Sequence, residues 1–405
     1  MDLVSSHATR GSHCQRSLAI VLLLSAACVG VAESCKLVDA SVRVTNELSH
    51  IPRSSADVAV ATYSDLVFLF AAGETALELV DSVTAPFAEA TAAAAGKLLA
   101  VRNNCVCPSL NGISDASCCI ASMEVQAFTW PSLDIDAAIH THGVTCPSGP
   151  LCGAIFTHVV NATLVAVANY IGGYATFFDL ATARSWQSTP VSASSLMHHL
   201  VPDTRCSQAT ADRLFGVDAG NYSVLTLDLR GAVLQRLQHT KRIRRLTLHP
   251  KLEFAYLLYE ADGEFGVWRW PDCTSLGEGM PPVELSVQAT LPAPVTMNKP
   301  TSLLVTRDGR FLYTCTRTHY VPGAPNYVGV FNVSAGTPQL VRWVPVPGNN
   351  TRDCALVGDD SLLVAADVAS NALLPFRIDA ATGDLTPMSP FTHESFAHPT
   401  MVVPL

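Results

Sequence analysis

The sequence predicts an all-β fold, a seven-bladed β-propeller, from two observations on its repeats and one on its periodicity. An apolar run, a short polar link and a second apolar or alternating run recur along the chain, which is the pattern of a β-hairpin. The copies cover residues 164–180, 213–229, 254–270, 311–333 and 362–379. Few long segments have the 3.6-residue period of a helix, so the repeat unit is made of strands.

The spacing of the copies gives the number of blades. One residue near the end of each first run serves as a ruler: Val167, Val217, Leu258, Cys315 and Ala365. The steps between them are 50, 41, 57 and 50 residues, which suits four short strands per unit. A mature chain of roughly 370 residues, at roughly 50 residues per unit, gives about seven blades.

The N-terminus predicts export. Residues 17–32 are mostly apolar and follow Arg10 and Arg16, and Gly30-Val31-Ala32 is a small-x-small cleavage site. We therefore expect a signal peptide over residues 1–32 and one propeller domain over residues 33–405, secreted or in the lumen of the secretory pathway. The alternative is a signal anchor, although about 16 apolar residues is short for a spanning helix. After cleavage we expect no stable membrane insertion.

Cysteine usage and glycosylation sequons support the same route. The chain has 13 Cys, and removal of Cys14 and Cys28 with the leader leaves 11, an odd number. Six cysteines in residues 103–152 predict a disulfide-stapled loop insertion in an early blade, since their spacing does not suit structural zinc. These cysteines are Cys105, Cys107, Cys118, Cys119, Cys146 and Cys152. Four sequons begin at Asn161, Asn221, Asn332 and Asn349.

Composition argues against a nucleic-acid partner. The net charge is −9, only 15% of residues are charged, and the longest basic run is the five-residue stretch Lys241–Arg245. A metal site at His140 and His142, with Asp134 and Asp136 nearby, lacks a third clear ligand. We expect no metal and no cofactor.

Three segments of the repeats resemble a known family. Arg244-Arg-Leu-Thr-Leu-His-Pro-Lys-Leu-Glu-Phe-Ala-Tyr-Leu-Leu-Tyr-Glu260 is similar to a family phrase that ends in Asn-Glu. Thr306-Arg-Asp-Gly-Arg-Phe-Leu-Tyr-Thr-Cys-Thr-Arg317 is similar to another that ends in Asn-Arg, and residues 376–387 resemble a blade-closing strand and turn. These phrases are typical of the seven-bladed propeller lactonases, which include bacterial 6-phosphogluconolactonases and fungal carboxymuconate cyclases. The resemblance is clear from about Leu164 to the end of the chain.

The resemblance implies a metal-free site of one His, two Arg and one Glu. By motif these residues are His198, Arg244, Glu260 and Arg317. Three supporting neighbours differ from the family pattern: Arg245, Tyr259 and Thr316 stand where the family has His, Asn and Asn. The resemblance also implies that the two termini share a blade, and the apolar segment 400–405 suits that pairing.

The residue types suit a small anionic lactone as substrate. A guanidinium group binds carboxylate or phosphate through two parallel hydrogen bonds and can stabilise charge on an acyl oxygen. Either His198 or Glu260 can act as the acid or base of lactone hydrolysis or formation, and the sequence does not assign the base. A structural salt bridge from Glu260 to one of the arginines is the simpler alternative. At the level of the whole protein, the alternative is a non-catalytic secreted propeller that binds a protein or a glycan.

Overall fold

The computed structural model describes residues 56–404 with internal gaps. The gaps are residues 63–65, 85–87, 95–96, 104–121, 130–140, 146–153, 204, 206–212, 272–280, 293–298, 318–324, 349, 394–395 and 397. The described residues belong to one compact unit, Arg43–Leu405. The expected signal peptide and the six clustered cysteines lie outside the described residues.

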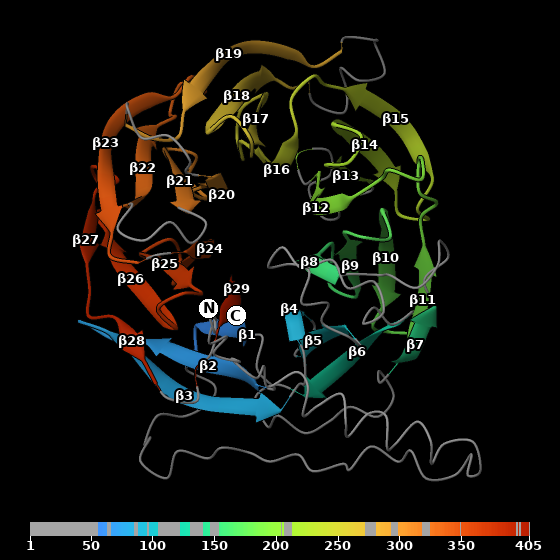
Figure 1. Cartoon of the computed structure of the whole chain (residues 1–405), viewed down its shortest axis with the longest axis horizontal. Helices are drawn as coiled ribbons and strands as arrows, with labels where there is room; N and C mark the ends of the chain where they lie inside the picture. The colour runs from blue at the N-terminus through green and yellow to red at the C-terminus, as the bar shows by residue number, and fades with distance from the viewer. Residues whose placement is uncertain are drawn as a thin grey trace, which may run out of the picture. The chain divides into compact units, whose positions relative to one another are not determined.

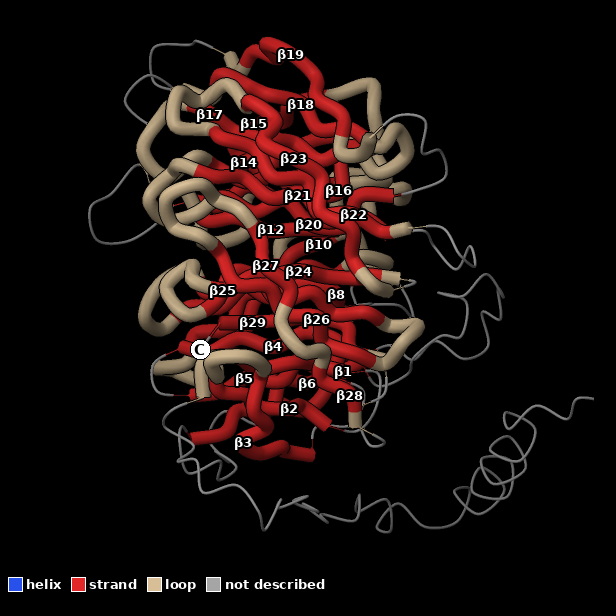
Figure 2. The backbone as a smooth tube through the Cα atoms, turned by 90° about the vertical axis from the view of Figure 1, so that its left-hand side faces the viewer, coloured by secondary structure: helices blue, strands red, loops and turns tan. Residues whose placement is uncertain are grey.

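The described residues form seven antiparallel sheets, each made of four strands in its main path. In Figure 1 the sheets surround a central axis, and Figure 2 shows that strands dominate the fold. Among these residues there is no helix, and so none that could cross a membrane. The predicted all-β propeller is therefore confirmed.

We call the sheets blades 1 to 7 and give their strands in chain order. Blades 1 to 3 contain β1 (Val58–Thr62), β2 (Leu66–Ala72), β3 (Leu77–Thr84), β4 (Ala88–Ala94), β5 (Lys97–Asn103), β6 (Ser122–Thr129), β7 (Thr141–Thr145), β8 (Ala154–Val159), β9 (Leu164–Asn169), β10 (Tyr174–Asp179) and β11 (Arg184–Gln187). Blades 4 and 5 contain β12 (Met197–Pro202), β13 (Arg213–Asp218), β14 (Ser223–Asp228), β15 (Val233–Gln238), β16 (Ile243–Leu248), β17 (Phe254–Tyr259), β18 (Glu264–Arg269) and β19 (Val283–Ala289). Blades 6 and 7 contain β20 (Lys299–Val305), β21 (Phe311–Arg317), β22 (Asn326–Asn332), β23 (Gln339–Val346), β24 (Thr351–Val357), β25 (Leu362–Asp367), β26 (Ala372–Ile378), β27 (Leu385–Pro387) and β28 (Phe391–Thr392), and β29 (Pro399–Pro404) completes blade 1.

The recurring phrases of the sequence are the second and third strands of blades 3 to 7. In four of these blades an Asp or Asn stands at the end of the third strand or directly after it, and its side chain accepts a hydrogen bond from the backbone N–H two residues later. These pairs are Asp179–Ala181, Asp228–Arg230, Asn332–Ser334 and Asp379–Ala381. A short polar side chain that bonds its own backbone favours a turn over a longer strand. The same local chemistry thus ends the third strand in each of these four blades.

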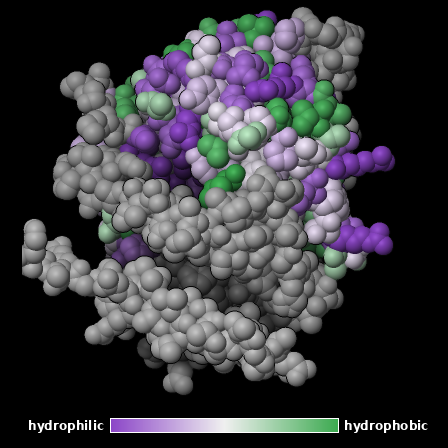
Figure 3. Space-filling view, turned by 45° about the vertical axis from the view of Figure 1, so that its right-hand side comes forward, coloured by the Kyte–Doolittle hydropathy of each residue, from purple (hydrophilic) through white to green (hydrophobic). Residues whose placement is uncertain are grey.

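The hydrophobic core lies between neighbouring blades. Blades 4 and 5 share a cluster in which the rings of Phe215 and Trp270 meet edge to face at 5.2 Å. Blades 7 and 1 share another around Phe68 and Phe396, whose ring centroids are 5.0 Å apart. Large apolar side chains are exposed on outer strands such as β19, and Figure 3 shows hydrophobic residues in separate groups among hydrophilic ones. Blades 4 and 5, and likewise blades 7 and 1, therefore depend on each other for burial of the faces that meet.

The C-terminal strand closes the ring. β29 pairs antiparallel with β1 and is the innermost strand of blade 1, as expected from the resemblance. Asp353 of blade 7 also accepts a hydrogen bond from the Val402 backbone N–H, at 3.2 Å. The closure thus joins the two ends of the chain by backbone pairing and by a buried carboxylate.

The region 103–152 is only partly an insertion. β6 and β7 lie in it: β6 pairs with β5 of blade 2, and β7 pairs with β6. The predicted range of a loop insertion is therefore too wide, because two of its segments are regular blade strands.

Deletion of residues 399–405 should destabilise the fold strongly, because it leaves the inner edge of blade 1 unpaired and exposes the buried contacts of Val402. We expect the midpoint of thermal unfolding to fall by about 10 °C or more. Pro404→Asp is the control, since Pro404 is exposed. An unchanged midpoint in the deletion would contradict closure by β29.

Candidate active site

The innermost strands of the blades share a β-bulge near their first residues. The pairing of each with the second strand of its blade shifts by one residue, so that one residue has no partner in the register. In β12, β16, β20 and β24 the extra residues are His198, Arg244, Thr301 and Arg352. A bulge turns a side chain out of the regular alternation of a strand. These four residues therefore occupy equivalent positions at one end of the central channel.

Glu260 is the centre of a group of charged side chains at this end of the channel. Its Oε1 is 2.9 Å from Nη1 of Arg244 and 3.4 Å from Nη2 of Arg317, and its Oε2 is 3.8 Å from Nε of Arg242. The side chains of Glu260, Arg244 and Arg317 are all about nine-tenths buried. The structure thus brings together three of the four residues proposed from the sequence, and it contains the ion pairs of the simpler alternative as well.

His198 completes the group from blade 4. Its ring meets Tyr170 edge to face at 5.5 Å, and Nη2 of Arg242 donates a 2.5 Å hydrogen bond to the Tyr170 hydroxyl. Nδ1 of His198 is buried and has no hydrogen-bond partner among the described residues. Tyr170 and Arg242 therefore link His198 to the carboxylate of Glu260.

Sequence reasoning missed Tyr170 and Arg242. Arg242 belongs to the basic run Lys241–Arg245, which resembled a solvated edge, and Tyr170 stands at the Gly-Gly turn between β9 and β10. The hairpin turn that holds Tyr170 was a sign that this residue could lie at the mouth of the channel. The sequence alone does not place that turn beside blade 5.

Positive charges outnumber negative charges around Glu260. Arg242, Arg244, Arg317, Lys299 and Arg352 all act electrostatically on Glu260 or on its partner Arg244. Burial opposes the ionisation of Glu260, but Arg244 and the other cations outweigh it and lower the pKa of its carboxyl group. Burial lowers the pKa of Arg244 to about 9, which still leaves its guanidinium group charged at neutral pH. The site has an excess of positive charge that suits an anionic ligand.

His198 is neutral in this environment. Burial is the largest cause, and the positive charges of Arg244, Arg245 and Arg317 add to it, so the pKa of His198 is well below 6.5. A neutral imidazole can accept a proton. Glu260, paired with two arginines and with a lowered pKa, is the weaker candidate for a base at this site.

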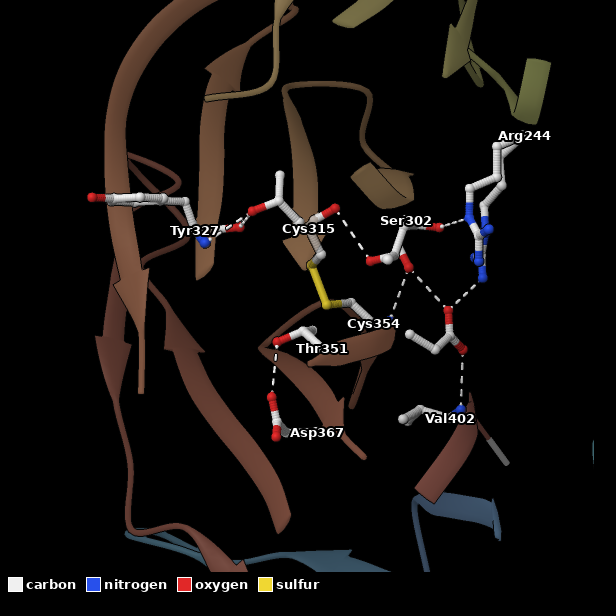
Figure 4. Close-up of a disulfide and its surroundings, with 12 residues drawn as sticks. Arg244, Ser302, Cys315, Tyr327, Thr351, Cys354, Asp367 and Val402 are labelled. Atoms are coloured by element: carbon white, nitrogen blue, oxygen red, sulfur yellow. Dashed lines mark hydrogen bonds and ion pairs between the residues drawn. A yellow bond between two sulfur atoms is a disulfide. The ribbon is translucent and has the colours of Figure 1, made fainter. Parts of the chain in front are cut away.

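A disulfide supports the wall of the site between blades 6 and 7. Cys315 of β21 and Cys354 of β24 are bonded and buried (Figure 4). Cys315 lies two residues before Arg317, and its carbonyl accepts a hydrogen bond from the hydroxyl of Thr301. The carbonyl of Thr301 in turn accepts a hydrogen bond from Nε of Arg244. The disulfide thus adjoins the backbone that holds both arginines.

The described residues contain no group of three or more His, Cys, Asp or Glu side chains that could hold a metal ion. Asp134, Asp136 and His140 of the possible histidine site lie outside them, and for His142 the structure describes only the backbone, in β7.

A family model described as Lactonase, 7-bladed beta-propeller matches residues 146–403. The chain belongs to this family. The matched residues include the whole group around Glu260 and exclude blades 1 and 2 apart from β29. The assignment thus rests on the part of the chain in which the family phrases are clear.

Known relatives agree with the family assignment. A 6-phosphogluconolactonase of Bacillus subtilis is 29% identical over 238 residues, which cover 55% of this chain and 65% of that protein, slightly under two thirds of its length. A solved protein from Lactobacillus plantarum has a TM-score of 0.67 at 18% identity and covers 86% of this chain and 99% of that one. A periplasmic gluconolactonase of Pseudomonas aeruginosa has a TM-score of 0.64 at 17% identity, with coverage of 86% and 98%. The two structural likenesses show the fold.

Glu260→Gln should destabilise the protein, because it leaves the buried guanidinium groups of Arg244 and Arg317 without their counter-ion. Breaking one side of a buried ion pair costs about 3–5 kcal/mol of unfolding free energy. Urea denaturation measures the change, and added phosphate should restore part of the loss. The control is Asp359→Asn, which removes an exposed ion pair with Arg307. Equal stability of the two variants would contradict a buried ion group.

Proposed function

We propose that this protein hydrolyses an anionic lactone at the group formed by His198, Arg244, Glu260 and Arg317. The observation that carries the proposal is the meeting of several cations and a neutral histidine around one carboxylate in a lactonase-family propeller. Arg317 and Arg244 bind the anionic group of the substrate and the oxygen that gains charge. Glu260 orients the two guanidinium groups and keeps them from repelling each other.

In the proposed reaction His198 is the general base. It takes a proton from water as the water oxygen attacks the lactone carbonyl carbon. The ring C–O bond then breaks, the imidazolium returns the proton to the leaving alkoxide oxygen, and the product is a hydroxy acid. The scheme uses side chains alone and requires no metal. Because the named relatives are lactonases, we propose hydrolysis and not the cyclisation reaction.

We also propose that the protein is exported. The buried Cys315–Cys354 disulfide supports this, since such bonds persist in oxidising compartments. Among the sequons, Asn221 is a poor glycan acceptor, because its Nδ2 donates hydrogen bonds to Ser195 and Asp218. In Asn161 it is Oδ1 that accepts a hydrogen bond, from the backbone N–H of Leu164, and this bond does not use Nδ2. Asn161 is therefore a better glycan acceptor than Asn221.

The direct test is turnover of 6-phosphogluconolactone, gluconolactone and a carboxymuconolactone by the disulfide-intact protein. We expect hydrolysis of an anionic member of this panel. His198→Gln should lower kcat/KM by about 10²–10⁴-fold, the usual contribution of a general base. His199→Gln is a matched control, because the ring of this neighbouring histidine packs on Phe156. Turnover of none of the three by folded protein would favour the non-catalytic binding module.

The pH dependence of turnover tests the role of His198. In the free enzyme its lowered pKa keeps it neutral, so kcat/KM should stay constant on acidification through pH 6.5 and fall only well below it. A bound anion offsets the charges of Arg244 and Arg317 and raises the pKa of His198, so the fall in kcat should occur at higher pH. Full pH–rate profiles measure both. Coincident falls of the two parameters, or a fall in kcat/KM above pH 6.5, would contradict His198 as the base.

A further inference from the structure

A second space lies at the other end of the central channel. This cavity has a volume of about 590 Å³ and is lined by residues that follow the bulges in the innermost strands. Examples are Val201 of β12, Leu248 of β16, Val305 of β20, Leu356 of β24 and Val403 of β29. Because these strands run in the same direction, the bulge residues and the cavity lie at opposite ends of the channel. Of the four proposed catalytic residues, none lines the cavity.

An ion pair forms the floor of the cavity. Nη2 of Arg245 in blade 5 is 2.6 Å from Oδ1 of Asp353 in blade 7, and the hydroxyl of Ser302 in blade 6 donates to the same oxygen at 2.9 Å. The guanidinium of Arg245 also lies over the ring of Phe156 in blade 3, 5.4 Å from its centroid. The pair thus joins blades 5 and 7 at the cavity lining.

The charges of the described residues that line the cavity are balanced. Arg245 pairs with Asp353, Arg205 pairs with Asp203 at 2.9 Å, and Arg307 pairs with Asp359 and Asp360 at the mouth. The rest of the lining is mainly aliphatic, as in the side chains of Val201, Leu303 and Met401. A charged ligand would have to break one of these pairs or be buried without a partner, and either is costly. The balance therefore favours an uncharged ligand.

The cavity also contains hydrogen-bonding groups that the described residues leave unused. His199 and His158 line it, and the buried Nδ1 of His199 has no hydrogen-bond partner among the described residues. The ring of His199 packs on Phe156 with centroids 4.1 Å apart, which fixes its position. Burial and the charge of Arg245 hold the pKa of His199 well below 6.5, so the ring is neutral and can accept a hydrogen bond. By contrast His249, which also lines the cavity, bonds the carbonyl of Gly309.

We propose that this cavity is a second binding site, for an uncharged and largely apolar small molecule whose hydroxyl group donates a hydrogen bond to His199. Its volume lies in the range of small-molecule sites, and its make-up of apolar walls with few convergent polar groups is typical of them. The site is distinct from that of the lactonase reaction, because none of the four proposed catalytic residues lines it.

The test is equilibrium dialysis of the full-length protein with 2-naphthol, naphthalene and 2-naphthoate as probes. We expect saturable 1:1 binding of 2-naphthol, weaker binding of naphthalene and the weakest binding of the carboxylate. Val403→Trp should lower the affinity for 2-naphthol at least tenfold, because the indole ring occupies the cavity. Val233→Trp is the matched control, since Val233 is exposed on the outer strand β15.

His199→Phe separates the hydrogen bond from the packing. It should weaken 2-naphthol about fivefold, the value of one hydrogen bond, and leave naphthalene unchanged. In the wild-type protein 2-naphthol should shift the imidazole NMR signals of His199 and His158 but not that of His239, which lies outside the cavity. This measurement keeps the test valid if Val403→Trp does not fold.

Three results would overturn the proposal. They are no saturable binding of 2-naphthol, equal binding by Val403→Trp and Val233→Trp, or binding of 2-naphthoate as tight as that of 2-naphthol. The last result would mean that Arg245 leaves Asp353 to bind an anion. Equal affinities of wild type and His199→Phe for 2-naphthol would overturn the assigned hydrogen bond.

Discussion

The arrangement of both ends of the channel depends on one extra residue in the innermost strand of each blade. A regular strand alternates its side chains between two faces, so consecutive residues cannot both serve the channel. The bulges remove that constraint. His198 and Arg244 stand at the bulge positions on the side of Glu260, and the next residues, His199 and Arg245, line the cavity on the other side. In both β12 and β16, two consecutive residues thereby contribute to two different environments.

The two environments differ in net charge, because their charged side chains are paired differently. Asp353 balances Arg245, whereas Glu260 is one carboxylate among several cations. An uncompensated positive charge close to a buried imidazole keeps that imidazole neutral, and an anionic substrate reverses the effect when it binds. The same excess of cations can therefore select the substrate and adjust the basicity of His198. In the unliganded protein the negative charge of Glu260 reduces the repulsion between these cations.

Local patterns in the sequence were enough to predict the repeating hairpins, because an apolar run and an Asp-ended strand such as β14 fold by nearby contacts. The family phrases located His198, Arg244, Glu260 and Arg317. Contacts between blades were not predictable in the same way. The Arg242–Tyr170 bond and the Arg245–Asp353 pair join residues 72 and 108 positions apart, and the Cys315–Cys354 disulfide joins a pair that no spacing rule selects. In residues 103–152 the cysteines concealed β6, which pairs with the preceding β5, and β7, which pairs with β6.

The central claim is that the cations around Glu260 recognise the negative charge of a lactone. The most direct measurement compares Arg317→Gln with Arg307→Gln for kcat/KM on 6-phosphogluconolactone and on uncharged gluconolactone. Both arginines belong to blade 6, but Arg307 is exposed and remote from Glu260. The account predicts a loss of about 100-fold or more for Arg317→Gln on the charged lactone, a much smaller loss on the uncharged one, and no loss for Arg307→Gln. Equal effects of Arg317→Gln on the two lactones, or equal activities of the two variants, would contradict it.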